Sequence, residues 1–447
     1  MKRWFVLRNI FTEFLPASLV SIFLCNAFGH ALAKSPPNQP PNIVVISADT
    51  LRADRLGFYG YEKNTSPNID TFLEDSVTFS QARTVEPLTA PAFVSMWTGK
   101  YPHQHGATRN GIRMFKGLES LPKLLGRHGY ISSAFISNWT LKAKLTGLNL
   151  HFEEYNEVLH HKRWFGLFFG EATAKDITAH AIDWVQSQDE GPYLLWAHYS
   201  EPHAPYIRHR EFEQQLGYNA KNLSKSQRYD TEIAFMDTHI GNLLTTLQSI
   251  PNTIVIFISD HGENLGEHGY WGHGRHLYEA SMRIPMAISW PEKLNPLVIH
   301  EPAMIIDIPK TILGLTQQTA YLESDGYDWA PFLLEQDNRL LLKNRIGFFQ
   351  AHKGALKNKS NMDRGRHKGL LCLGILKDQT MELFYLKGKK HFYYQLTNPA
   401  APLIPGNSDF SPQLIRWANE IQLSERAPQQ QLSPGELDQL KSLGYLE

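Results

Sequence analysis

Four short apolar runs, rich in β-branched and aromatic residues, recur along the first part of the chain. They are Asn42–Ala48, 130–136, Tyr193–Tyr199 and 253–258. Runs of this length and composition are typical of strands that are buried on both faces of a parallel sheet. Segments with apolar residues at helical spacing, such as 174–185 and 233–247, lie between them. The alternation predicts an α/β fold, a doubly wound, mostly parallel sheet with helices on both faces.

Polar residues followed by proline mark where two of the helices begin. Ser66 precedes Pro67, and Ser120 precedes Pro122 by two positions. Serine is a favoured N-cap residue and proline is tolerated in the first helical turn, so we expect Ser66 and Ser120 to be N-caps. Asp237 and Glu232, on the predicted helix before the last strand, are interpreted as capping residues or as groups that support the site.

The pattern changes after about residue 334. Short strand-like runs at 370–376, 382–386 and 391–396 are followed by helical patterns at 411–421 and 434–443. We therefore predict a main α/β domain over 42–334 and a small C-terminal antiparallel α+β subdomain over 335–447.

The N-terminus has the pattern of a signal peptide. Basic residues at positions 2, 3 and 8 precede a mostly apolar stretch, 14–28, and the A-x-A cleavage pattern Ala31-Leu32-Ala33. The sequence predicts a signal peptide over 1–33, a Pro-rich linker over 34–41, and export to the periplasm or secretion. An uncleaved membrane anchor is the weaker alternative, because the apolar stretch is short and Pro16 interrupts it.

Composition narrows the range of partners. The chain has 44 Lys plus Arg and 44 Asp plus Glu, so it has no excess of positive charge that would favour binding to nucleic acid. We therefore expect no nucleic acid among its partners. No Walker loop or G-x-G-x-x-G follows the first strand, which argues against a nucleotide cofactor. Cys372 would be the single cysteine after signal cleavage, which excludes an internal disulfide. The sequence gives no prediction of oligomeric state, and contact with a membrane stays an alternative.

Side chains that can bind a metal follow two of the predicted strands. Asp49 follows the first, and the pair Asp260 and His261 follows the last. In open α/β sheets the ligand crevice lies outside the carboxyl ends of the strands, so we expect these residues to meet. Carboxylates and an imidazole suit a divalent ion, Ca, Mg, Mn or Zn. The alternative is an ordinary strand end followed by a polar loop.

A hydroxyl and several imidazoles are the candidate reactive groups. Thr89 precedes a helical pattern at 92–98, and a helix N-terminus favours an anion. A metal ion lowers the pKa of a bound hydroxyl, so Thr89 is predicted to be a metal ligand and nucleophile, or alternatively only an N-cap. His203 and His273 are predicted to bind the oxygens of an anionic group or to protonate a leaving group. His198 lies near the end of the third predicted strand and is a candidate substrate-binding residue.

An aromatic-rich insertion at 151–170, around Trp164, interrupts the α/β pattern. The favoured interpretation is a loop packed on its own side chains. The alternative is a wall for an apolar or lipid-like leaving group.

Five segments together resemble the sulfatase family, within the alkaline phosphatase superfamily. They read PNIVVISADTLRADRLGFYGY, LTAPAFVSMWTGKYPHQHG, EPHAPY, SDHGENLGEHGYWGHGRHLYEASMRIP and SPGELDQLKSLGYLE. The resemblance implies that Asp49, Asp260 and His261 are metal ligands and that His203 contacts the anionic group. It also implies that His273 stands where related enzymes have a lysine. Asn138 falls where many sulfatases carry a lysine and a histidine, and it is a candidate substrate-binding residue.

The sequence departs from the family pattern at the nucleophile. Sulfatases typically carry C-x-P-x-R or S-x-P-x-R, and the first residue is oxidised to formylglycine. Here the segment runs from Thr89 to Phe93, TAPAF. Threonine cannot give that aldehyde, so no formylglycine is expected, and the arginine of the pattern is lost to Phe93. A covalent Thr intermediate needs attack by water or another acceptor, as in the phosphatase, phosphodiesterase and phosphoethanolamine-transferase branches.

These observations lead to one main hypothesis and two alternatives. The main hypothesis is an exported, metal-dependent hydrolase or transferase that cleaves a phosphate or, less favoured, a sulfate ester of a small molecule, lipid or glycan. The first alternative is a catalytically silent sulfatase-like protein that binds a sulfated or phosphorylated ligand. The second is a water-activating metal hydrolase in which Thr89 is only an N-cap, with no covalent intermediate.

Overall fold

The computed structural model describes ten segments, all of which belong to one unit spanning Ser35–Glu447. The described residues are 39–159, 161–163, 168–188, 191–219, 221–318, 320–335, 345–354, 369–396, 400–406 and 411–423. The predicted signal peptide, most of the linker and the predicted helix at 434–443 lie outside them, as do Trp164 and the core of the aromatic insertion. Those predictions therefore stay predictions.

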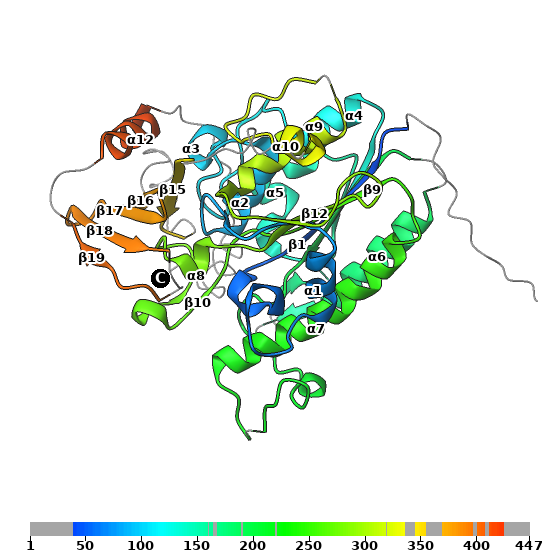
Figure 1. Ribbon diagram of the computed structural model, residues 1–447, viewed down its shortest axis with the longest axis horizontal. Coiled ribbons are helices and arrows are strands. Elements are labelled where there is room, and N and C mark those ends of the chain that lie inside the picture. The colour runs from blue at the N-terminus through cyan, green and yellow to red at the C-terminus, as the bar shows by residue number, and fades with distance from the viewer. Residues whose placement is uncertain are drawn as a thin grey trace, which may run out of the picture. The chain divides into compact units, whose positions relative to one another are not determined.

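An eight-stranded sheet forms the centre of the unit (Figure 1). Its order is β13 (Leu297–Ile299), β2 (Val77–Phe79), β12 (Met286–Ser289), β9 (Thr253–Ser259), β1 (Asn42–Ala48), β8 (Tyr193–Tyr199), β4 (Ile131–Ile136) and β5 (Glu154–Glu157). The five strands from β9 to β5 run parallel, and β12 is antiparallel to both of its neighbours. The four strands predicted from the apolar runs are therefore the adjacent central strands, and the predicted fold class is confirmed.

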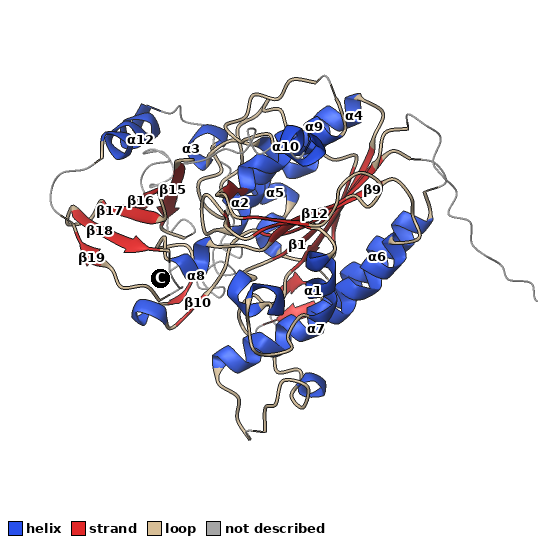
Figure 2. Ribbon diagram, viewed as in Figure 1, coloured by secondary structure: helices blue, strands red, loops and turns tan. Residues whose placement is uncertain are grey.

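Helices cover both faces of this sheet, because alternate residues of β1 enter two separate cores. Ile43 and Val45 pack with α2 (Thr89–Thr98), α4 (Leu121–Arg127) and α9 (Ile308–Leu315). Val44 and Ile46 pack with α1 (Pro67–Glu74), α6 (Ala174–Gln186) and α7 (Lys225–Leu247). Figure 2 shows these two helical layers on opposite sides of the sheet. Every residue of β1 after Asn42 is buried, as the unbroken apolar run predicts.

The two predicted serine N-caps have different outcomes. Ser120 accepts a hydrogen bond from the Lys123 N–H at the start of α4, so this prediction is confirmed. Ser66 occupies the predicted N-cap position before Pro67, but its side chain makes no cap hydrogen bond and contacts Asp70 instead. Asp237 of α7 supplies the missing acceptor, since it accepts from the Ile69 N–H at 2.8 Å. A carboxylate from a neighbouring helix has replaced the local hydroxyl, and the capping interpretation of Asp237 is confirmed.

The C-terminal part contains a second, antiparallel sheet. Its strands are β15 (Gly347–His352), β16 (Leu370–Lys377), β17 (Thr380–Tyr385), β18 (Lys390–Gln395) and β19 (Ile404–Pro405), and α12 (Pro412–Leu423) follows. The Trp417 indole of α12 donates to the Phe349 carbonyl at 3.2 Å, and its ring lies 4.7 Å from that of Tyr101. The predicted small antiparallel α+β part is confirmed, although β15 and β19 were not predicted.

Shorter elements complete the described structure. They are β3 (Ala82–Arg83), α3 (Pro102–His105), α5 (Ala143–Thr146), β6 (His161–Arg163), β7 (Phe168–Glu171), β10 (Asn264–Leu265), β11 (Trp271–Gly272), α8 (Glu279–Met282), β14 (Ala303–Met304) and α10 (Ala330–Glu335). None of the helices within the described segments has the length and apolar character needed to cross a membrane.

Candidate active site

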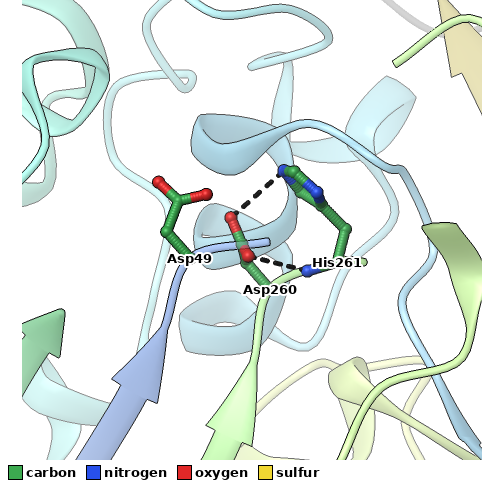
Figure 3. Close-up of side chains that lie close together, drawn as sticks. All are labelled: Asp49, Asp260 and His261. Carbon is green, nitrogen blue, oxygen red and sulfur yellow. Dashed lines mark hydrogen bonds and ion pairs between the residues drawn. The ribbon is translucent and has the colours of Figure 1, made fainter. Parts of the chain in front are cut away.

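Two adjacent strands bring the predicted metal ligands together. Strands β1 and β9 are parallel and in register, with Ala48 opposite Ser259. The residues that follow them, Asp49 and Asp260, therefore emerge side by side at the same edge of the sheet (Figure 3). Asp49, Asp260 and His261 are all buried, and each offers a ligand atom within 4.8 Å of the others.

The Asp260 carboxylate has one satisfied and one unsatisfied oxygen. Oδ1 accepts hydrogen bonds from the Thr50 N–H at 3.0 Å and the His261 N–H at 2.7 Å. Oδ2 is buried, accepts no hydrogen bond from the described residues, and lies 3.3 Å from His261 Nε2. Burial raises the pKa of Asp260 to about 7. A buried carboxylate oxygen without a donor is the environment that a cation would stabilise.

The His261 ring is held in the form that binds metals. Nδ1 lies 2.9 Å from the Gly262 carbonyl, so Nδ1 carries the proton and Nε2 presents a lone pair. Burial, together with the nearby His273 and His203, holds the pKa of His261 well below its usual value, so the ring is neutral. Two carboxylates and a neutral imidazole fit a divalent cation of hard to borderline character, in agreement with the predicted Ca, Mg, Mn or Zn.

Thr89 lies next to this cluster. It is the first residue of α2, and its Oγ1 is 3.5 Å from His261 Nε2. Leu88 occupies the N-cap position, so the alternative interpretation of Thr89 as the N-cap is wrong. The hydroxyl therefore faces the cluster at a helix N-terminus, where an anionic group is favoured.

Two further imidazoles lie beside the cluster, His273 against His261 and His203 against His273. The ring of His273 lies 4.4 Å from that of His261 and 5.4 Å from that of His203. His203 Nδ1 is 2.7 Å from the Ala204 carbonyl, and His273 Nδ1 is 3.1 Å from Glu263 Oε1. The structure thus brings both predicted histidines to the Asp–His cluster, each with Nδ1 held by an acceptor.

Comparison with known proteins establishes the family. A model described as Sulfatase matches residues 41–318, which is more than half of the chain. The chain belongs to the sulfatase family. The predicted resemblance and the predicted enzyme class, a hydrolase of sulfuric or phosphoric esters, are confirmed.

Individual sulfatase relatives cover most of the chain. N-acetylgalactosamine-6-sulfatase of Mus musculus is 26% identical over 373 residues, which cover 70% of each protein. Among solved structures, Ps i-CgsB in complex with k-i-k-neocarrahexaose has a TM-score of 0.67 at 18% identity, covering 91% of this chain and 98% of that one. Phosphonate monoester hydrolase SpPMH from Silicibacter pomeroyi has a TM-score of 0.63 at 16% identity, covering 86% and 94%. At these identities the solved structures show the shared fold.

The resemblance to the family placed Phe93 of α2 where the family pattern has an arginine. Its ring packs 5.0 Å from those of Trp196 and His198. The side chain is fully buried.

The two candidate substrate-binding residues, Asn138 and His198, make contacts within the protein. Asn138 donates its amide to Asp49 Oδ2, so it orients a candidate metal ligand. His198 is fully buried, accepts a hydrogen bond from Ser137, and packs against Phe93 and Trp196. Burial lowers the pKa of His198 to about 3. Substrate contact by either residue stays a prediction.

Sequence reasoning missed two polar residues that the structure places around the candidate site, Glu263 and Asn110. Glu263 orients His273 and also accepts from the Tyr206 hydroxyl at 3.0 Å. Asn110 accepts from the Ala90 N–H at 2.9 Å, and its own amide nitrogen has no hydrogen-bond partner among the described residues. Glu263 could have been suspected, since it follows His261 by two positions. Asn110 has no such signal, because it lies in a loop 20 residues after Ala90.

Proposed function

We propose that this sulfatase-family protein is exported and cleaves phosphate esters with Thr89 as the nucleophile, by hydrolysis or by transfer to an acceptor. The observation that carries the proposal is the position of Thr89 Oγ1, 3.5 Å from His261 Nε2 in the Asp–His cluster. A sulfate ester is the less favoured substrate.

The side chains around Thr89 suggest how the reaction proceeds. A divalent cation held by Asp49, Asp260 and His261 would supply positive charge that favours the ionised hydroxyl and offsets the anionic group. The Thr89 hydroxyl releases its proton to solvent and Oγ attacks phosphorus, the bond to the alcohol oxygen breaks, and a proton from His203 or His273 goes to that oxygen. Water or an acceptor alcohol then attacks the Thr89 phosphoester, which restores the hydroxyl and releases the product.

The chemistry of threonine favours phosphorus over sulfur. A formylglycine hydrate expels sulfate by collapsing to an aldehyde, and a threonine ester has no such route. Its intermediate must be cleared by attack on the transferred group itself. The shared fold with a protein named phosphonate monoester hydrolase supports a phosphorus ester in this scaffold.

The relatives also suggest the alcohol portion of the substrate. They include N-acetylgalactosamine-6-sulfatase, and one solved structure of the same fold is in complex with k-i-k-neocarrahexaose. We therefore favour a glycan ester, with a lipid or other small-molecule ester as the alternatives. An exported enzyme would meet such glycans outside the cytoplasm.

Parallel turnover assays test this proposal. Nitrophenyl phosphate, bis(nitrophenyl) phosphate and nitrophenyl sulfate are offered to the mature protein with several divalent metals. We expect metal-dependent cleavage of a phosphate ester, a loss on the order of 10³-fold or more in Thr89→Ala, and partial activity in Thr89→Ser. Thr98→Ala is the matched control, because Thr98 lies at the other end of α2 and bonds the Val94 carbonyl.

Other outcomes would change the assignment. Unchanged turnover in Thr89→Ala would show that Thr89 is not the nucleophile. Thr89-dependent cleavage of the sulfate ester alone would overturn the phosphoester preference. Metal-dependent ligand binding without turnover of any ester would favour the silent binding protein.

A further inference from the structure

Arg109 lies in the loop after α3, next to Asn110 of the candidate site. It is 5% exposed, and its Nε is buried with no hydrogen-bond partner among the described residues. Within the described segments no carboxylate lies within 4.0 Å of its guanidinium. Burial lowers the pKa of Arg109 to about 10, still well above neutral, so the side chain carries its charge. Burying an unpaired charge is costly, which makes such a residue unusual in a folded core.

Glu86 is the acidic group that acts on Arg109, but its oxygens have other partners. Glu86 Oε1 accepts the His352 N–H at 2.8 Å, and Oε2 lies 2.9 Å from His352 Nδ1. Glu86 therefore influences Arg109 only through space. The planar guanidinium suits two parallel hydrogen bonds to one anion, and the described residues offer it no such anion.

The guanidinium lies on the side of the site formed by the C-terminal sheet. A Cβ added to Gly369, just before β16, would come 2.8 Å from Arg109 Nη1 and 3.0 Å from Cζ. The neighbouring Asn110 contacts the Ala90 N–H at the start of α2. Arg109 is thus adjacent in sequence to Asn110, which contacts the start of α2. Its guanidinium lies against Gly369, just before the C-terminal sheet.

We infer that Arg109 binds a second anionic group of the substrate, a carboxylate, sulfate or phosphate carried by the alcohol portion. This inference rests on the proposed function, because it assumes that the ester itself is attacked by Thr89. None of Arg109's described contacts is with Thr89, Asp49 or His261, so the guanidinium does not belong to the place of the transferred group. The substrate class is therefore an acidic ester, such as the phosphate of an acidic sugar.

Two esters that differ by one charge test this inference. Nitrophenyl phosphate is compared with an analogue that carries a carboxylate on its ring, using wild type, Arg109→Gln and Arg109→Lys. We expect Arg109→Gln to raise KM for the carboxylated ester about tenfold to a hundredfold, with kcat nearly unchanged. For nitrophenyl phosphate the change should stay within about threefold. Analogues with sulfate or phosphate in place of the carboxylate identify the preferred anion.

The controls separate this role from a structural one. Arg127→Gln removes the same charge from an exposed arginine paired with Glu119, and it should leave both esters unchanged. Arg109→Gln should unfold at the same or a higher temperature than wild type, because it removes an unpaired buried charge. Equal losses for both esters, or no change for either, would overturn the inference.

Binding measurements keep this test independent of turnover. If wild type cleaves neither ester, the proposed function has failed, and calorimetric titration of Thr89→Ala protein with the same two compounds examines Arg109 alone. Tighter binding of the carboxylated compound, lost when Arg109→Gln is added, would support the inference. Equal binding of the two compounds would contradict it.

Discussion

At the scale of single residues, Asn138 fixes the orientation of Asp49, a candidate metal ligand. Its amide donates to Asp49 Oδ2, and its own Oδ1 is fixed by the Thr140 N–H at 2.9 Å. Removing such an orienting group typically weakens metal binding about tenfold to a hundredfold. We therefore expect Asn138→Ala to lose bound metal at lower chelator concentrations than wild type, as measured by metal analysis after dialysis.

Asn156 provides the control for this prediction. It is a half-buried asparagine on β5 of the same sheet, and its amide bonds Ser133 rather than a site residue. Asn156→Ala should keep the metal affinity of wild type. Equal metal retention by Asn138→Ala and wild type would show that the contact with Asp49 does not orient a ligand.

His198 makes the folded state sensitive to acid. Its pKa is lowered to about 3 by burial, whereas an unfolded histidine titrates near 6.5. The unfolded state therefore binds the proton first, and stability is lost as pH falls from about 6.5 towards 3. At pH 5 this amounts to about 2 kcal/mol relative to neutral pH, from about 1.4 kcal/mol per pH unit.

A neutral replacement isolates this effect. We expect the free energy of unfolding, measured in urea, to fall less between pH 7 and pH 5 for His198→Gln than for wild type, by about 2 kcal/mol. The difference between the two proteins removes the contribution of all other titrating groups. Parallel pH profiles would mean that His198 is protonated equally in the folded and unfolded states.

The positions of candidate site residues could be predicted where the local sequence determines which strand or helix they adjoin. Asp49 directly follows one predicted strand, and Asp260 and His261 follow another after Ser259. Thr89 lies at the start of a helix. The hydrophobic pattern alone therefore predicts that these residues meet at one edge of the sheet. Asn110 and Arg109 were not predictable, because their importance depends on which distant backbone their loop approaches. The replacement of Ser66 by Asp237 as the cap of α1 has the same origin.

At the scale of elements, α7 supports the strained turn after β1. Thr50 has a φ of 55°, an unfavourable value for a β-branched residue. The Tyr229 hydroxyl of α7 donates to the Thr50 carbonyl at 2.6 Å and accepts from the Arg52 N–H at 3.0 Å. This helix therefore holds the turn in which Thr50 donates to Asp260.

Tyr229→Phe tests this support. The substitution removes the hydrogen-bond partner of the Thr50 carbonyl and of the Arg52 N–H. Each loss lowers the free energy of unfolding by at most about 1 to 3 kcal/mol. We expect lower stability in denaturant titrations together with weaker metal binding. Thr238→Ala, which removes a side-chain bond within α7 to the Ala234 carbonyl, should leave metal binding unchanged. Normal metal affinity in Tyr229→Phe would show that the turn holds its shape without α7.

The strands also show where the hydrophobic pattern alone is sufficient to predict an element. Strands β1, β8 and β9 follow their apolar runs closely, since burial on both faces imposes a continuous pattern. Strand β19 has only two residues, and its pairing with β18 depends on tertiary contact rather than composition. Tyr229 was likewise not singled out, because a tyrosine on an amphipathic helix usually belongs to the core.

At the scale of the whole molecule, one apolar core joins the two sheets. Ile43 of β1 and Phe349 of β15 belong to the same cluster of buried residues. The predicted boundary at 334/335 therefore raises a question of cooperativity: the C-terminal part either unfolds with the main sheet or before it. Trp417 is suited to answer it, because it is 2% exposed and its ring lies 4.7 Å from those of Tyr101 and His103.

Trp417→Ala should destabilise the protein as one cooperative unit. Deleting a buried tryptophan costs about 3 to 5 kcal/mol, and the shared core should transmit that loss to both sheets. We expect a single unfolding transition at a lower urea concentration than in wild type. Tryptophan fluorescence and the hydrolysis of the ester substrate should change at the same urea concentration. Trp271→Ala, at a residue that is 47% exposed, should cost less than about 1 kcal/mol. Two separate transitions, with activity lost at the wild-type urea concentration, would instead show that residues 335–447 fold as a domain of their own.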